Sequence, residues 1–334
     1  MRKPVLDMHL HLAGVGHGGT GCWYHPDRLR SLPVRILLAS LRIPADERER
    51  DLDGALRRRL IETVEGATDL DGAVVLALDW ARDERGRPDR ERTDFFVPND
   101  YVLDLARTHP RLRAGASVHP YRPDAVDEVH RVAEAGAALV KWLPACQNFS
   151  PLDPRCDRVY AALAACGLPL LCHTGSEGAT RVHRQAWNDP RVLRRALDAG
   201  VTVIAAHCGM RSNPLDRDYR HVWRTLLRTH PNLYGDTSSL FGARAQAFVR
   251  FSQAAEVRER LVHGSDWPVP GSPWWLLGRL PLRRIRALGR IANPLDRDLA
   301  TKRALGLPDA VFTRAAQLLA GPLPAVRERN EPET

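Results

Sequence analysis

Several features that would assign a sequence to a class at once are missing from these 334 residues. No uninterrupted apolar run is long enough to span a bilayer, and the mean hydropathy is negative, so a membrane protein is not expected. The chain runs directly from its N-terminus into the first predicted strand, which leaves no room for a signal peptide. We therefore expect a cytoplasmic protein with no membrane partner.

Two common ligand-binding motifs are also absent. None of the six cysteines forms a Cys-x-x-Cys pair, so we expect reduced thiols and no structural zinc knuckle. The glycine-rich stretch 14–21 contains neither the P-loop lysine pattern nor a dinucleotide fingerprint, so it is not predicted to bind phosphate. We interpret this stretch as a loop at the mouth of a site.

The sequence lacks a basic run interleaved with aromatic residues, although its net charge is +9. The positive residues are mostly arginine, and acidic residues alternate with them, as in the segment 46–51. A groove for single-stranded nucleic acid combines basic residues with stacking aromatics. We therefore expect no nucleic-acid partner, and we interpret the charge as a solvated surface suited to a small, anionic substrate.

The N-terminal stretch 5–12 alternates strictly between apolar and polar residues, which predicts a β-strand. The alternation puts Leu6, Met8, Leu10 and Leu12 on one face and Asp7, His9 and His11 on the other. Two histidines at positions i and i+2 of a strand point the same way, about 6–7 Å apart along its axis. Their ring nitrogens can therefore converge on one cation.

Seven further strand-like segments follow, separated by helical segments. Such alternation predicts parallel strands with right-handed crossovers, and eight units predict a closed (β/α)8 TIM barrel of the α/β class. We expect a single domain over 1–334, with a helical insertion at 14–68 and a helical C-terminal extension at 270–334. The eight predicted strands are 5–12, 71–80, 112–118, 137–144, 168–175, 201–209, 232–238 and 261–268.

Polar residues lie at the C-terminal ends of these strands, where the active site of such a barrel is found. They are His9, His11, Lys141, His173, His207 and Asp266. Strand alternation places His173 on the face of Leu171, His207 on the face of Val203 and Ala205, and Asp266 on the face of Gly264 and Val262. By the same alternation His263 faces outward, and we interpret it as a packing residue.

Imidazoles and a carboxylate with no thiolate are a ligand set typical of zinc, with manganese or iron as substitutes. His9, His11, His173 and Asp266 supply four ligands, and Asp266 can also accept the proton of a metal-activated water. His207 is left to orient or protonate the substrate, or to bind a second metal. His119 and Gln147, in strand-end loops, and Lys141 are candidate substrate-binding residues.

These motifs together resemble the amidohydrolase superfamily, in particular the branch that includes aminocarboxymuconate-semialdehyde decarboxylase and dicarboxylate lactonases. The resemblance rests on Asp7-Met8-His9-Leu10-His11, His173-Thr174-Gly175, Ala206-His207-Cys208-Gly209 and Gly264-Ser265-Asp266-Trp267-Pro268. It implies metal ligation by His9, His11, His173 and Asp266, catalysis by His207, and Asp266 as general base. In binuclear relatives a carboxylated lysine at the position of Lys141 bridges two metals, with the strand-six histidine on the second. The number of metal ions, one or two, is thus left open. If Lys141 is not carboxylated, we expect it to be an unmodified cation that binds a substrate carboxylate.

Three functions remain open on sequence grounds. The first is a metal-dependent hydrolase in which an activated water attacks an amide, lactone or ester carbonyl. The second is a metal-dependent, non-oxidative decarboxylase of an unsaturated or aromatic acid. The third, a binding protein on a degenerate barrel, is disfavoured because the full set of histidines has no packing purpose. A homo-oligomeric assembly is also left open.

Overall fold

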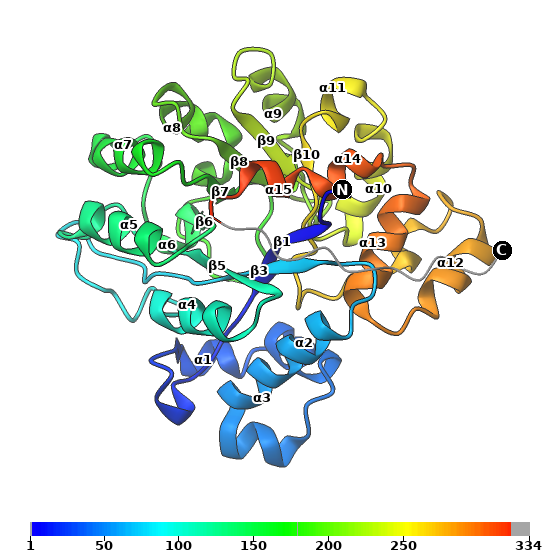
Figure 1. Cartoon of the computed structure of the whole chain (residues 1–334), viewed down its shortest axis with the longest axis horizontal. Helices are drawn as coiled ribbons and strands as arrows, with labels where there is room; N and C mark the ends of the chain where they lie inside the picture. The colour runs from blue at the N-terminus through cyan, green and yellow to red at the C-terminus, as the bar shows by residue number, and fades with distance from the viewer. Residues whose placement is uncertain (1, 179, 322–334) are drawn as a thin grey trace.

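The computed structural model describes residues 2–178 and 180–321 and confirms the (β/α)8 barrel (Figure 1). Eight parallel strands follow one another around a single sheet in chain order, as right-handed crossovers require. They are β1 (Leu6–His11), β3 (Gly72–Leu76), β5 (Leu112–Ala116), β6 (Leu139–Trp142), β7 (Leu170–His173), β8 (Val203–Ala206), β9 (Leu233–Asp236) and β10 (Leu261–Val262).

The last strand is shorter than the predicted segment 261–268, yet the chain beyond it closes the barrel. Backbone hydrogen bonds join β1 to the residues after β10: Met8 N donates to His263 O at 3.2 Å, and Asp266 N donates to His9 O at 2.8 Å. A third runs from His11 N to Trp267 O at 2.6 Å. The first and last strands are therefore held edge to edge at the end where the candidate site lies.

Helices surround the sheet and alternate with its strands, as the sequence predicts. The sequence predicts a helix over roughly 123–135 that stops at Gly136, and Gly136 has a φ of +88°, a conformation that glycine adopts without steric cost. The helices between the strands are α4 (Asn99–Thr108), α5 (Ala125–Glu134), α6 (Pro144–Gln147), α7 (Asp157–Ala165), α8 (Arg194–Asp198), α9 (Arg220–Leu226), α10 (Gly242–Phe251) and α11 (Ala255–Arg258).

The predicted insertion after β1 is largely helical and projects from one side of the barrel (Figure 1). It contains α1 (Pro26–Leu29), α2 (Leu32–Ser40) and α3 (Ala45–Glu65). It also contains β2 (Trp23–Tyr24), which pairs antiparallel with β4 (Phe95–Phe96). The sequence predicts one helix over residues 95–109, but α4 begins only at Asn99. Phe95 and Phe96 form β4, where Phe95 stacks on Tyr24 of β2 and Phe96 stacks on Trp80.

Apolar side chains from the inner faces of the strands fill the barrel interior. Leu6, Met8, Val74, Leu171 and Ile204 belong to this inner cluster, and all are fully buried. Helices α14 (Asp309–Thr313) and α15 (Ala315–Leu318) of the C-terminal extension cover one end of the barrel, where Ala315 joins the same cluster (Figure 1). The extension also contains α12 (Leu282–Gly289) and α13 (Pro294–Ala304), and its part from 322 to 334 lies outside the described residues.

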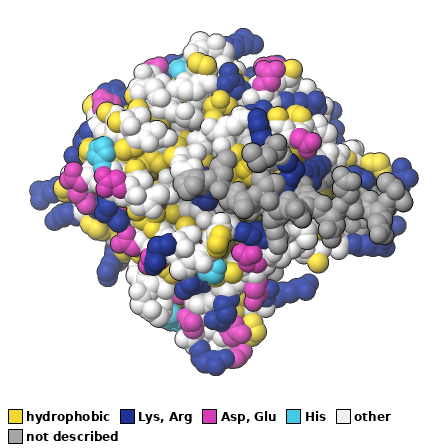
Figure 2. All heavy atoms as spheres, viewed as in Figure 1, with side chains coloured by type: hydrophobic (Ala, Val, Ile, Leu, Met, Phe, Trp, Pro, Cys, Tyr) yellow, Lys and Arg dark blue, Asp and Glu magenta, His cyan; other side chains and the backbone are white. Residues whose placement is uncertain are grey.

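The surface mixes the two signs of charge. On the face seen in Figure 2, acidic side chains are interspersed among the more numerous basic ones. Within the described part of the chain, no helix is both long and apolar enough to cross a bilayer. All six cysteines are free thiols, as predicted.

Candidate metal centre

A β-bulge in β1 turns both of its histidines toward the interior. Asp7 pairs with Ala73 of β3, and Leu10 pairs with Val75. The step is three residues in β1 but only two in β3, so one extra residue lies in β1. Met8 packs in the inner cluster, whereas Leu10 packs in the outer one. The prediction that Leu6, Met8, Leu10 and Leu12 share one face is therefore wrong: the first two point inward and the last two outward.

Asp7 also departs from the predicted face, since its carboxylate binds backbone rather than the site. One oxygen accepts hydrogen bonds from the amides of His9 (3.0 Å) and Ser265 (2.9 Å), which ties the bulge to the loop after β10. Burial raises the pKa of Asp7 to about 7. His263 does face away from the site, as predicted, and its ring packs 5.5 Å from that of Phe312.

His207 and Asp266 reach the interior through left-handed backbone rather than through strand alternation. Their φ angles are +62° and +69°. Val203 and Ala205, the predicted face-mates of His207, pack in the outer cluster, while Ile204 lies inside. The prediction was thus right that His207 enters the site but wrong about its face, because the chain turns out of β8 at that residue.

Three candidate ligand atoms converge at the C-terminal end of the barrel. The Nε2 atoms of His9 and His11 are 3.1 Å apart, and each lies 3.3 Å from Asp266 Oδ1. A side chain at position 264 would crowd this arrangement, because a Cβ there would lie 2.9 Å from the Cβ of His9. Glycine at 264 therefore lets the segment after β10 lie close to His9.

Asp236, at the end of β9, fixes which nitrogens of two histidines carry protons. It is fully buried, and its Oδ2 accepts from His9 Nδ1 at 2.7 Å. Its Oδ1 accepts from Ser238 Oγ at 2.5 Å, which leaves that hydroxyl to accept from His207 Nδ1 at 2.8 Å. Both imidazoles are then protonated on Nδ1, so each presents a bare Nε2 lone pair, the form in which histidine binds a metal.

The charges around Asp236 keep it ionised. Burial alone would raise its pKa, but the interaction and hydrogen bond with His9, the interaction with His207 and the Ser238 hydrogen bond together hold the pKa well below its ordinary value. Burial and the neighbouring Lys141 lower the pKa of His9, so this imidazole is neutral at pH 7. A carboxylate that binds a ligating histidine from behind is the usual support of a metal site.

His173 carries the clearest sign that a cation belongs here. Its Nε2 is buried and has no hydrogen-bond partner among the described residues. Burial lowers its pKa to about 4, so the imidazole is neutral. Its ring centroid lies 4.9 Å from that of His207, which in turn lies 5.7 Å from that of His9. A buried imidazole nitrogen without a partner among the described residues, on a ring that packs against His207, is suited to a divalent metal.

Lys141 lies inside this group, as the sequence predicts. Its side chain is fully buried, and its Nζ is 3.0 Å from His9 Nε2. Burial lowers its pKa. The amine therefore points at the lone pair that a metal would take, which places Lys141 at the metal centre rather than out in the substrate cavity.

His119 and Gln147 lie away from the site and contact each other instead. His119 Nε2 donates to Gln147 O at 2.9 Å, and its Nδ1 accepts from Tyr121 N. The Gln147 side chain is occupied by the Leu143 amide at 2.7 Å and by Asp79 O at 3.2 Å. Neither residue is part of the cavity lining, so the structure does not bring them to a substrate as the sequence analysis expected.

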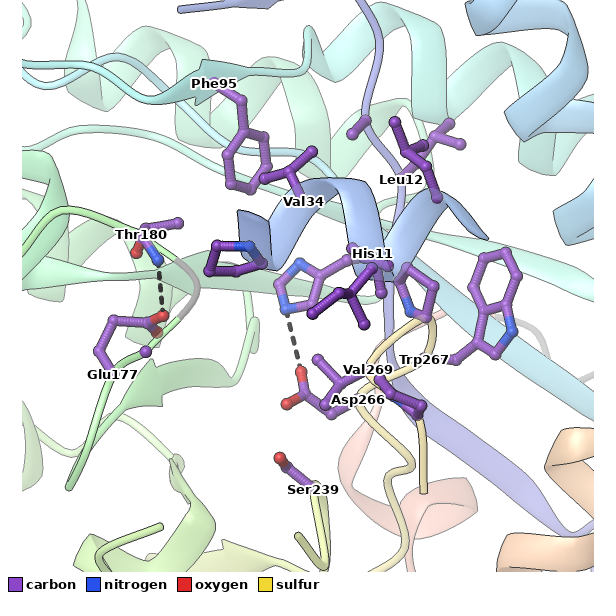
Figure 3. A pocket seen from close by; sticks show the side chains of 18 of the residues that line it. His11, Leu12, Val34, Phe95, Glu177, Thr180, Ser239, Asp266, Trp267 and Val269 are labelled. Carbon is purple, nitrogen blue, oxygen red and sulfur yellow. Dashed lines mark hydrogen bonds and ion pairs between the residues drawn. The ribbon is translucent and has the colours of Figure 1, made fainter. Parts of the chain in front are cut away.

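A cavity of about 490 Å³ opens directly on the metal centre (Figure 3). His11 and Asp266 lie at its wall and point toward each other, with Val34 and Phe95 beyond His11 (Figure 3). Its polar residues are His11, Tyr24, His173, Ser176, Glu177, Thr180, His207, Ser212, Ser239, Arg244 and Asp266.

Three functional candidates were not predicted from the sequence: Asp236, Glu177 and Arg244. Asp236 is the last residue of β9, the position at which other strands carry their site residues, so the sequence did contain a signal for it. Glu177 lies in the loop after β7, 3.6 Å from His173 Nδ1. Arg244 lies on α10 among many other arginines, and nothing in the sequence singles it out.

Fold and site together define a barrel protein with a candidate metal centre at the C-terminal ends of its strands. The chain belongs to the amidohydrolase family, whose sequence profile matches residues 6–311. This membership confirms the predicted resemblance and suggests an enzyme. A search of curated proteins gave no match.

Solved structures show the same fold at low identity. An uncharacterised TIM-barrel protein from Bordetella bronchiseptica is 16% identical, with a TM-score of 0.59 over 94% of this chain and 97% of that one. A protein from Pseudomonas putida, described as a candidate 2-pyrone-4,6-dicarboxylic acid hydrolase, is also 16% identical, with a TM-score of 0.55 over 96% of this chain and 95% of that one. These similarities support the barrel and not a particular reaction.

Proposed function

We propose that this protein is a metal-dependent hydrolase that cleaves an amide, lactone or ester bond in a small anionic substrate. The observation that carries the proposal is the convergence of His9 Nε2, His11 Nε2 and Asp266 Oδ1 at the wall of a cavity. His173, with its unpaired Nε2, completes the four predicted ligands. Nitrogen and oxygen ligands favour zinc, with manganese or iron as substitutes.

A bound divalent cation supplies Lewis-acid chemistry, since it lowers the pKa of water and polarises a carbonyl oxygen. Asp266 accepts the proton that the attacking water loses. Burial alone would raise its pKa, but its interactions with His9 and His207 and the hydrogen bond with His11 hold it well below its ordinary value. The carboxylate is therefore ionised at neutral pH, the state that a proton acceptor must have.

His207 presents its Nε2 to the same cavity. Burial and the charge of Arg244 lower its pKa well below the ordinary value, so it is neutral and acts as an acceptor toward the substrate. Its Nδ1 is held by Ser238, which fixes the ring orientation. In a site with two ions the same Nε2 would be a ligand of the second.

Arg244 supports an anionic substrate. It lines the cavity and is 2% exposed. In the described part of the chain its guanidinium donates only to backbone carbonyls of Ser176, Met210 and Ser239, at 3.2–3.4 Å, and its Nε has no partner. A buried guanidinium without a carboxylate partner is suited to a carboxylate or phosphate brought by the substrate.

The test is turnover by protein loaded with Zn²⁺ or Mn²⁺, assayed against p-nitrophenyl esters, lactones and amides, with released CO₂ measured in parallel on aromatic acids. We expect metal-dependent hydrolysis that His11→Ala and Asp266→Ala abolish. CO₂ release without any hydrolysis would overturn the proposal in favour of the decarboxylase. Metal content per chain separates a site with one ion, where Lys141 is a plain amine, from a two-ion site, where a carboxylated Lys141 bridges.

A further inference from the structure

The cavity has two chemically different ends. Most of its polar residues gather around the metal centre, while the wall that the insertion supplies is apolar apart from Tyr24. We use the name apolar chamber for the part of the cavity lined by Leu12, Val34, Leu37, Leu52, Leu56 and Phe95. Leu12, Val34 and Phe95 are drawn in Figure 3, where they lie on the side of His11 away from Asp266 and Ser239.

Helix α2 is turned so that its apolar residues serve the cavity. Val34 is 6% exposed, and Leu37 is partly buried at the same wall. Leu32 and Ile36 also line the cavity, although they are 66% and 56% exposed, so they form an apolar rim. The charged residue of this helix, Arg35, is not part of the lining.

This wall discriminates against polar groups. A hydroxyl or carboxylate in the apolar chamber would lose its water without gaining a hydrogen-bond partner. A hydrocarbon group there removes apolar surface from water on both sides of the contact. The size of the whole cavity is that of sites for ligands well beyond a two- or three-carbon acid.

We propose that the apolar chamber binds a hydrocarbon group of the substrate, an acyl chain or an alkyl-substituted ring, while the scissile carbonyl lies at His11 and Asp266. The substrate class is therefore an amphiphilic ester, amide or lactone, with its polar end toward Arg244. The inference rests on the proposed function for the position of the reacting carbonyl. The binding of a hydrocarbon chain does not depend on which reaction follows.

Binding of straight-chain carboxylates tests the apolar chamber without any turnover. We expect isothermal titration of butanoate, hexanoate and octanoate to show one site per chain, with the Kd falling about fourfold per added methylene. That dependence amounts to roughly 200-fold from butanoate to octanoate. A Kd that does not change with chain length would overturn the proposal.

Two variants and a matched control locate the binding. Val34→Phe adds four side-chain carbons inside the apolar chamber. The alkanoate length beyond which affinity no longer rises should therefore be about three methylenes shorter than in the wild type. Leu37→Asp introduces a carboxylate at the same wall and should abolish the chain-length dependence. Ala39→Phe adds the same aromatic ring on α2 outside the lining and should behave as the wild type. Equal effects of Val34→Phe and Ala39→Phe would refute the assignment.

Hydrolysis of p-nitrophenyl acetate, butyrate, hexanoate and octanoate by the metal-loaded protein separates the two proposals. We expect kcat/KM to rise with acyl length in parallel with alkanoate binding. Alkanoate binding without hydrolysis of any ester, lactone or amide would refute the hydrolase and leave the apolar chamber standing. Hydrolysis that is indifferent to acyl length, with no alkanoate binding, would refute the chamber and leave the hydrolase standing.

Discussion

Replacing Asp236 by asparagine tests whether one buried carboxylate sets up the metal centre. The substitution keeps the size of the side chain. An asparagine oxygen in the place of Oδ1 can still accept from the amide of His207 at 2.8 Å and from Ser238 Oγ. What changes is the other end, where Oδ2 accepts from His9 Nδ1 at 2.7 Å. An amide NH₂ there faces an imidazole N–H, and two donors repel each other.

The magnitude follows from that single contact. His9 either loses a charge-assisted hydrogen bond, worth about 1.5–3 kcal/mol, or moves its proton to Nε2 and so blocks its own ligand atom. Loss of a carboxylate behind a ligating histidine typically weakens metal binding by about 10- to 100-fold. We therefore expect Asp236→Asn to lose about 2 kcal/mol of metal-binding free energy, which is a roughly 30-fold weaker metal affinity.

The assay is competition for Zn²⁺ against a chromophoric chelator at pH 7.5, with circular dichroism to confirm folding. Asp296→Asn is the matched control, because Asp296 is also a buried carboxylate that accepts backbone amides, from Thr68 and Asp69, but among the described residues no imidazole hydrogen-bonds to it. We expect the control to keep wild-type affinity even where it loses stability. Zinc affinity of Asp236→Asn within threefold of wild type would show that the tautomer argument is wrong.

Three further expectations concern turnover, substrate charge and pH. In His207→Asn the amide keeps a donor for Ser238 but removes Nε2, so we expect bound metal with at least about 100-fold slower turnover; loss of half the metal would instead mark His207 as a ligand of a second ion. Arg244→Met should lower kcat/KM about 10- to 100-fold for carboxylate-bearing substrates and leave uncharged analogues unaffected, and equal losses on both would contradict the anion role. Burial lowers the pKa of His119 to about 3, whereas the pKa in the unfolded chain is 6.5. Because only the unfolded chain binds this proton between those two pH values, the free energy of unfolding falls as the pH drops from about 6.5 toward 3, by about 2 kcal/mol at pH 5. Urea unfolding of His119→Gln should lack this part of the pH dependence.

The fold was predictable because its signals are local. Each strand is an apolar run of a few residues, and each helix is an amphipathic segment ended by a turn signal such as Gly136. Alternation of the two element types then leaves few topologies. The errors lie where pairing over long distances overrides local preference, as at Phe95 and Phe96, which read as the start of a helix and instead pair with Trp23 and Tyr24.

The membership of the metal centre was predictable, but its geometry was not. Position at a strand end singled out His9, His11, His173, Lys141 and Asp266, and the structure brings all five to one end of the barrel. The same criterion applied to β9 would have found Asp236. Arg244 and the aliphatic wall of α2 lie outside the strands, and their positions depend on how the insertion and the loops pack.

The departures from strand alternation coincide with the ligand candidates for a physical reason. Regular strands supply only every second residue to the interior, so a dense cluster needs a bulge at His9 and left-handed backbone at His207 and Asp266. Such backbone costs of the order of 1–3 kcal/mol at each left-handed residue and persists only where surrounding contacts fix it. Two buried acids and one backbone contact supply these contacts: Asp7 accepts from the amide of His9 at the bulge, Asp236 accepts from the amide of His207, and the amide of Asp266 donates to His9 O. The acids that orient the imidazoles of His9 and His207 are therefore residues outside the cavity lining.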